Sequence, residues 1–323
     1  MRHPAARAMM AAFAGLGMLL TACGTTAGSS RGTPGDGVVE VVASTSVYGD
    51  IVRTIGGDKV RVTSIITRTS QDPHSYEATT QDKLTVSKAE LVLENGGGYD
   101  DFIRKLAEDT GLDHNNLISA AEVSGLAPAS AGAQAPSTAA ATDAAGHVRA
   151  GFNEHVWYSM AAMTRLADAV ADKLGALEPS SAATFRSNAA SFKGSLADLE
   201  GKLAAVKASA GHAAVAVTEP VPLYMLEDAG LENKTPAEYS KAIEEDADVP
   251  PAVLKAAVDL VGSGGIRFLA YNPQTEGPQT VALKKAAEAA HIPVLNFSET
   301  LPEGQSYVQW MTGNVDSIRK ALG

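Results

Sequence analysis

The chain has 323 residues, 45% of them hydrophobic and 20% charged, a composition typical of a globular protein with room for two hydrophobic cores. Aspartate and glutamate number 37 against 26 lysines and arginines, and the formal charge of −11 argues against electrostatic binding of nucleic acid. A single cysteine excludes internal disulfides, CxxC redox chemistry and cysteine-based zinc clusters.

The first 22 residues have the pattern of a secretory signal peptide. Two arginines give a basic start, and residues 8–22 carry no charge and end in small residues before Cys23. Because roughly 20 apolar residues are needed to span a bilayer, this stretch is too short for a membrane helix, and the alternative is a buried N-terminal helix. The LTAC sequence that ends at Cys23 resembles the lipobox of bacterial lipoproteins. That resemblance implies cleavage before Cys23, which then carries diacylglycerol as a membrane anchor.

Strand and helix patterns alternate after a polar linker. Residues 23–37 are rich in glycine, serine and threonine, which predicts a flexible tether. The alternation that follows predicts a parallel sheet with helices on its faces, an N-terminal α/β lobe over 38–179. Its expected strands cover 38–43, 60–66 and 90–94, and its expected helices cover 47–55, 79–88, 100–108 and 156–174.

Residues 127–146 interrupt this lobe with a low-complexity stretch. They are almost entirely alanine, serine, threonine, proline and glycine, with His147 just beyond them. This composition buries too little apolar area to offset the entropy of ordering, so we expect a disordered surface loop.

The segment 180–208 has the most regular pattern in the chain. Its large apolar residues recur at alternating spacings of four and three, which predicts a helix of roughly 40 Å with one apolar stripe. The stripe comprises Phe185, Ala189, Phe192, Leu196, Leu199, Leu203 and Val206. A coiled-coil dimer is the alternative, but the flanking charge is weak, and we expect a monomer in which this helix joins two lobes.

The second half repeats the organisation of the first. We expect a C-terminal α/β lobe over 209–323, and therefore two Rossmann-like lobes with a cleft between them. Its expected strands cover 213–218, 267–271 and 293–297, and its expected helices cover 223–229, 250–261, 279–290 and 307–322.

Four polar residues lie where ligands bind in such sheets, at or beyond strand ends. His74 and Glu219 follow strands, Glu299 follows the strand at 293–297, and His155 precedes a helix. Two neutral imidazoles and two carboxylates would neutralise a divalent cation. Each residue alone also fits a solvated or capping role. His212 lies at the opposite end of the strand that Glu219 follows, so both cannot bind one ion.

Enzyme signatures are absent from the sequence. It contains no GxSxG, HExxH, P-loop or GxGxxG motif. Catalytic zinc keeps an open coordination position, whereas four protein ligands close the coordination shell. We therefore expect a binding protein, not an enzyme; a zinc hydrolase with one open position is a less favoured alternative.

From about residue 38 to 322 the chain resembles the zinc/manganese class of substrate-binding proteins of bacterial ABC importers. The DPHxYE motif around His74 is the most specific match, and the order of the segments strengthens it. The segments are VAST at 42–45, YGDI at 48–51, GGDKV at 56–60, DPHSYE at 72–77, NGGGYD at 95–100, NEHVWY at 153–158, SY at 306–307 and WM at 310–311.

The resemblance implies that the two lobes hold a metal in their cleft. It carries the ligands onto His74, His155, Glu219 and Glu299 of this chain. Zn²⁺ is favoured over Mn²⁺ because manganese lies at the weak end of the divalent affinity series, although bidentate carboxylates would suit manganese.

The resemblance also implies the partners and the location of the protein. We expect an extracytoplasmic lipoprotein, anchored through Cys23, that delivers metal to an ABC permease and its ATPase. A metal-binding surface adhesin and an organic-solute carrier are the alternatives, although the cleft motifs contain no evident arginine clamp for a carboxylate.

Overall fold

The computed structural model describes residues 37–126 and 152–323. The expected signal peptide, Cys23, the tether up to residue 36 and the low-complexity loop at 127–146 lie outside the described residues. The chain from Gly37 to Gly323 forms one compact unit. Among its described helices, none combines the length and apolarity that crossing a bilayer requires.

The N-terminal lobe is built on a parallel sheet with strand order β2-β1-β3-β4. Its central strand β1 pairs Val41 with Val62 on one side and with Leu91 on the other. The elements are β1 (Val39–Thr45), α1 (Ser46–Gly56), β2 (Val60–Ile66), α2 (Thr80–Val86), β3 (Leu91–Glu94), α3 (Asp101–Thr110), β4 (Leu117–Ser119) and α4 (Ala120–Ser124).

The two faces of this sheet belong to different cores, because successive side chains of a strand point to opposite faces. Val41 of β1 belongs to the large core that includes residues of α1 and of the two helices that follow the lobe. Its neighbour Val42 packs on the other face with Phe102 and Ile103 of α3. Both faces are therefore covered, as parallel sheets require.

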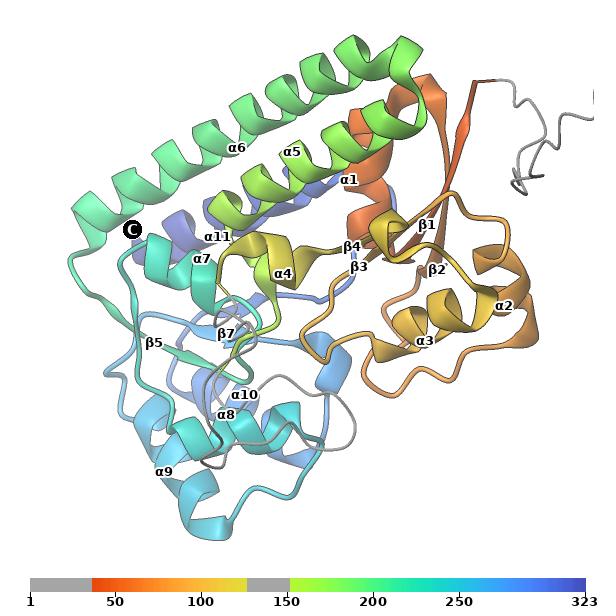
Figure 1. Ribbon diagram of the computed structural model, residues 1–323. Helices are drawn as coiled ribbons and strands as arrows, with labels where there is room; N and C mark the ends of the chain where they lie inside the picture. The colour runs from red at the N-terminus through yellow and green to blue at the C-terminus, as the bar shows by residue number, and fades with distance from the viewer. Residues whose placement is uncertain (1–36, 127–151) are drawn as a thin grey trace, which may run out of the picture. The chain divides into compact units, whose positions relative to one another are not determined.

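Two long helices follow the N-terminal sheet and lie side by side (Figure 1). They are α5 (Met160–Leu177) and α6 (Ala182–Ala210), and α6 has 29 residues, which makes it about 43 Å long. The predicted apolar stripe of α6 is buried along its whole length. The helix ends where Gly211 adopts a left-handed φ of 46°, a conformation that glycine tolerates without a steric penalty.

The C-terminal lobe repeats the architecture with strand order β6-β5-β7-β8, again all parallel. Ala216 of β5 pairs with Leu269, and Leu269 of β7 pairs with Val294. The elements are β5 (Ala214–Val217), α7 (Leu223–Asp228), β6 (Glu232–Asn233), α8 (Ala237–Glu244), α9 (Pro251–Gly262), β7 (Leu269–Tyr271), α10 (Pro278–Ala289), β8 (Val294–Asn296) and α11 (Tyr307–Leu322).

One continuous core joins the two lobes through α6. Val41 of β1, Leu199 of α6 and Val215 of β5 all belong to it. Helix α6 contacts α1 and α5 of the first half and α7 and α11 of the second (Figure 1). The start of α11 is also bound to the N-terminal half, because the Tyr307 amide donates a hydrogen bond to Asp50 at 2.7 Å. The lobes are therefore packed together and not merely linked.

The predicted fold class is confirmed: two α/β lobes with parallel sheets are joined by a long helix. Sequence patterns missed the strands β4 and β6 and the helices α4 and α8. The helix expected from residue 156 begins later, because Val156–Tyr158 form a 3₁₀ turn and the Ser159 hydroxyl caps α5 by accepting the Ala162 amide. The boundaries of the signal peptide, tether and lobes stay predictions.

The shared core predicts that both lobes unfold together. Leu199→Ala removes a side chain that is 1% exposed, and we expect it to lower the free energy of unfolding by about 3 kcal/mol. Urea unfolding followed by circular dichroism should still show one transition. Lys202→Ala, on the exposed side of α6, is the matched control and should change little. Two separate transitions in the wild type would contradict the shared core.

Candidate metal centre

His74 lies in the loop between β2 and α2, beyond the carboxyl end of the N-terminal sheet. The Asp72 carboxylate accepts the His74 amide at 2.9 Å and the Ser75 hydroxyl at 2.6 Å, which closes a local turn. The imidazole packs edge-on against Tyr99, with ring centroids 4.9 Å apart. The DPHSYE segment thus holds the histidine in a defined orientation before any ligand arrives.

His155 precedes the 3₁₀ turn Val156–Tyr158 and is completely buried. Its Nδ1 lies 2.7 Å from Oδ1 of Asn153. Because an amide oxygen only accepts hydrogen bonds, Nδ1 carries the proton and Nε2 keeps its lone pair. Nε2 is buried and has no hydrogen-bond partner. An orphaned imidazole nitrogen of this kind is suited to a metal ion.

The backbone that carries His155 is attached to both lobes. Asn95, at the end of β3, donates to the Glu154 carbonyl at 3.0 Å. On the other side, the Asn153 amide donates to the Pro220 carbonyl at 3.0 Å, and the Tyr224 hydroxyl donates to the Asn153 carbonyl at 2.7 Å. These bonds set the position of His155 relative to both sheets.

Glu299 follows β8 of the C-terminal sheet and is buried. Its Oε1 accepts a hydrogen bond of 2.7 Å from the Asn272 amide, and its backbone amide donates to Gln274 at 2.7 Å. Asn272 follows β7, so the neighbouring strand orients the carboxylate. The position beyond a strand end is the one that the sequence predicts.

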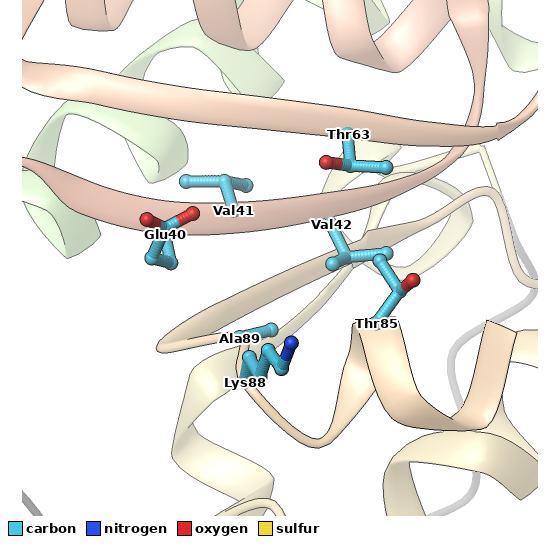
Figure 2. A pocket seen from close by; sticks show the side chains of 7 residues that line it. All are labelled: Glu40, Val41, Val42, Thr63, Thr85, Lys88 and Ala89. Carbon is cyan, nitrogen blue, oxygen red and sulfur yellow. The ribbon is translucent and has the colours of Figure 1, made fainter. Parts of the chain in front are cut away.

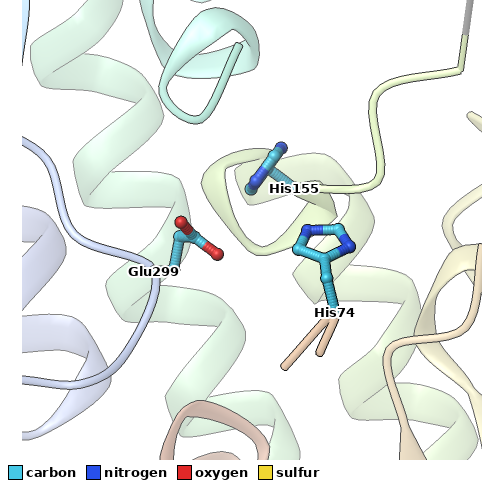
Figure 3. A group of neighbouring side chains, drawn as sticks. All are labelled: His74, His155 and Glu299. Atoms are coloured by element: carbon cyan, nitrogen blue, oxygen red, sulfur yellow. The ribbon is translucent and has the colours of Figure 1, made fainter. Parts of the chain in front are cut away.

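The structure brings together three of the four predicted ligands. Ligand atoms of His74, His155 and Glu299 all lie within 4.8 Å of one another. Figure 3 shows the two imidazoles and the carboxylate pointing toward a common point. The histidines come from the N-terminal half of the chain and the glutamate from the C-terminal half, as the two-lobe interpretation requires.

Glu219, the fourth predicted ligand, lies near this group without belonging to it. It follows β5, is 3% exposed, and accepts a hydrogen bond from the Thr275 hydroxyl. Its carboxylate is not part of any group of metal-ligating atoms within 4.8 Å that the described residues form. Its role as a ligand stays a prediction.

Two carboxylates that sequence analysis did not select also face the imidazoles. Glu154 and Glu244 each place Oε1 3.9 Å from Nε2 of His74, and Glu244 Oε1 is 3.5 Å from Nε2 of His155. Glu154 directly precedes His155 and could have been found from that adjacency. Glu244 lies in an acidic run at the end of α8, where the sequence resembles an ordinary solvated surface.

Burial and mutual repulsion shift the pKa values of these groups. Burial, and then the neighbouring Glu219, raise the pKa of Glu299 to about 8, and burial raises that of Glu219 to about 7. Burial, and then Glu154, raise the pKa of Glu244 to about 10. Burial, and then His74, lower the pKa of His155 well below its usual value, so its imidazole is neutral at pH 7.

The donor set fits a divalent transition metal. Among the described residues, no lysine or arginine forms an ion pair with Glu219, Glu244 or Glu299, so these carboxylates lack a fixed cationic partner. Neutral imidazole and carboxylate oxygen are ligands that zinc and manganese accept. A dication at the point shared by His74 and His155 would stabilise the ionised form of these carboxylates and displace their protons.

A hollow lies elsewhere in the N-terminal lobe (Figure 2). It has a volume of about 210 Å³ and lies against β1, β2 and the end of α2. Glu40 and Lys88 are the charged residues in its lining, which contains no histidine. This lining offers no donor set for a transition metal, so the histidine cluster is the candidate site.

Comparisons with known proteins find relatives among metal-binding proteins. A family model described as "Zinc-uptake complex component A periplasmic" (ZnuA) matches residues 41–321. The manganese-binding lipoprotein MntA of Bacillus subtilis (strain 168) is 29% identical over 182 residues, which is 55% of this chain and 52% of that protein. The chain spans from about a third to about half of the length of the curated relatives that it matches.

Solved structures share the fold. The periplasmic zinc-binding protein TroA from Treponema pallidum superimposes with a TM-score of 0.68 at 19% identity, covering 89% of this chain and 100% of that one. FpvC from Pseudomonas aeruginosa, in complex with Mn²⁺, has a TM-score of 0.66 at 22% identity, covering 88% and 98%. At these identities the likeness establishes the architecture alone.

The raised carboxylate pKa values predict that metal affinity falls with pH. Below pH 8 the Glu299 carboxyl, and below pH 7 the Glu219 carboxyl, increasingly carry protons that an arriving cation must displace. His155, with its lowered pKa, contributes little in this range. We expect at least tenfold weaker binding at pH 6 than at pH 8. Calorimetry in two buffers of different ionisation enthalpy should show proton release; equal affinity without release would contradict the prediction.

Proposed function

Because the chain belongs to the family of zinc-uptake complex component A proteins, we propose that it captures a divalent transition metal outside the cytoplasm and delivers it to an ABC permease and its ATPase. The binding proteins of this family are non-enzymatic transport components, so the zinc hydrolase alternative is rejected. Capture without chemistry agrees with the absence of enzyme motifs from the sequence.

The convergence of His74, His155 and Glu299 is the observation that carries this proposal. Their ligand atoms lie within 4.8 Å of one another, although they are far apart in the sequence. The buried Nε2 of His155 has no partner inside the protein. Leaving such a group unsatisfied costs free energy, and a bound ion removes that cost.

We assign the ligand set to His74, His155, Glu219 and Glu299. For Glu219 the support is its burial beyond β5 and its electrostatic coupling to Glu299. Ligation by Glu219 requires its carboxylate to exchange its hydrogen bond with the Thr275 hydroxyl for the ion. Zn²⁺ binds such a site more tightly than Mn²⁺, in accordance with the usual order of divalent affinities.

Attachment to the membrane belongs to the same proposal. The LTAC sequence ending at Cys23 supports removal of residues 1–22 and acylation of the cysteine. MntA, a relative of this chain, is itself named a lipoprotein. An anchored binding protein stays close to the permease, which raises the local concentration of the loaded form there.

Removing either imidazole tests the metal site. We expect His74→Ala and His155→Ala to weaken Zn²⁺ binding at least tenfold, because each removes one donor from a small set and tenfold corresponds to only about 1.4 kcal/mol. Isothermal calorimetry on metal-free protein measures the change.

His114→Ala is the control for the loss of a histidine, since His114 lies exposed in a turn far along the chain from the site residues. Its affinity should equal that of the wild type. Unchanged affinity in both site variants, with one ion bound in each, would refute the assignment.

Replacing the cysteine separates anchoring from binding. Cys23→Ala should leave metal affinity unchanged but move the protein from the detergent phase to the aqueous phase in Triton X-114 partitioning, because the acyl chains are lost. Equal partitioning of wild type and Cys23→Ala would exclude the lipid anchor.

Growth under metal chelation tests the transport role. In a strain without the chromosomal copy, the wild-type protein should restore this growth and His155→Ala should not.

A further inference from the structure

Glu244 ends helix α8 in the C-terminal lobe and points at both histidines. Its side chain is 15% exposed, and its Oε1 lies 3.5 Å from Nε2 of His155 and 3.9 Å from Nε2 of His74. Oε1 of Glu244 and Nε2 of His155 are both buried and both lack a hydrogen-bond partner. Two unsatisfied atoms therefore face each other across a short gap.

These separations fit ligands of one metal better than hydrogen bonds. Protein hydrogen bonds between nitrogen and oxygen rarely exceed about 3.2 Å. Donors on a tetrahedral zinc ion, with bonds of about 2.0–2.1 Å, lie about 3.3–3.4 Å apart. The distance of 3.5 Å from Glu244 Oε1 to Nε2 of His155 is close to this separation of two donors on one ion. The distance of 3.9 Å to Nε2 of His74 needs only a small adjustment.

Without a bound cation, the surroundings of Glu244 disfavour its ionised form. It ends a helix, where the macrodipole is negative and repels an anion. The carboxylates of Glu154, Glu219 and Glu299 repel it further. Within residues 37–126 and 152–323, no lysine or arginine forms an ion pair with it. In such surroundings the ionised carboxylate is stable only beside a cation, and the two imidazoles that it faces mark where a cation would bind.

We propose that Glu244 is an additional protein ligand of the ion assigned to His74, His155, Glu219 and Glu299, and that it shifts the selectivity of the site toward Mn²⁺. This inference rests on the proposed function. Zinc in protein sites is satisfied by four donors, whereas manganese prefers more oxygen donors in a larger shell. A further carboxylate therefore stabilises bound Mn²⁺ more than bound Zn²⁺, even though Zn²⁺ remains the more tightly bound ion.

Glu244 and Glu154, the two carboxylates that the sequence did not predict, differ in which imidazoles they face. Glu154 faces Nε2 of His74 at 3.9 Å and comes from the same segment as His155. Glu244 reaches both imidazoles and comes from the opposite lobe. A ligand on α8 would therefore add a second bond between the lobes through the ion, beside that of Glu299.

The test is Glu244→Ala with Glu245→Ala as the matched control. Glu245 is the next residue, its side chain is 59% exposed, and it pairs with Lys241 on the surface. For each metal-free protein, the affinities for Zn²⁺ and Mn²⁺ are measured by competition with a chromophoric chelator. We expect Glu244→Ala to lower the Mn²⁺ affinity at least tenfold and to lower the Zn²⁺ affinity by a factor several-fold smaller. The control should bind both ions with the affinities of the wild type.

Loading with Co²⁺ separates ligation from a through-space charge effect. If Glu244 is a ligand, its removal lowers the coordination number, and the visible absorption of Co²⁺ changes toward that of a four-coordinate ion. Glu244→Gln preserves the side-chain volume and serves as the second variant if circular dichroism shows that Glu244→Ala is misfolded. Its loss of Mn²⁺ affinity should have the same direction.

The outcomes distinguish this inference from the proposed function. Unchanged Mn²⁺ and Zn²⁺ affinities in a folded Glu244→Ala would overturn the inference alone, provided that His74→Ala still weakens binding. Equal losses for both metals with an unchanged Co²⁺ spectrum would also overturn it, in favour of a purely electrostatic role. A wild type that binds neither ion would refute the proposed function itself.

Discussion

Both parallel sheets contribute one face to a single core that also contains helix α6, and this shared core holds the loops at their carboxyl ends in a fixed relation. Val41 of β1 and Val215 of β5 belong to one continuous core together with Leu199 of α6. Because protein cores are densely packed, the lobes cannot move far apart without opening that core. The hydrogen bonds from Asn95 and Tyr224 to the segment that carries His155 also hold the two lobes together. A rigid scaffold can position donors for a small ion without large reorganisation on binding.

The site gathers buried carboxyl groups that no lysine or arginine of the described residues pairs with. Glu219, Glu244 and Glu299 are buried or nearly so, and each has a raised pKa because burial disfavours its ionised form. The imidazole of His155 is neutral for the same reason. The free energy stored in this arrangement favours the loaded state, and protons compete with the metal for the same oxygens. Affinity and the acidity of the surroundings are thereby coupled.

Sequence patterns and structure agree best where the signal is local. The apolar stripe of α6, from Phe185 to Val206, follows from helical periodicity and is buried as expected. His74 and His155 stand out because turn-forming neighbours and strand ends surround them, and the structure brings their ligand atoms together with Glu299. The strands β4 and β6 were missed because so few residues carry little periodicity, whereas the short strands β7 and β8 lie within longer, mostly apolar runs that the sequence shows.

The linear order of residues was enough to establish two α/β lobes, a long connecting helix and a pair of histidines beside acidic groups, because periodicity and turn chemistry are properties of neighbouring residues. Which acids approach the imidazoles was decided only in three dimensions. Glu219 occupies the expected strand end yet bonds to Thr275, whereas Glu244, in an acidic run that resembles exposed surface, reaches both histidines. Helix α8 packs through Tyr239 in the core of its own lobe, and the fold brings the end of this helix to histidines from the other half of the chain. Contacts between segments so distant along the chain leave no local sequence pattern.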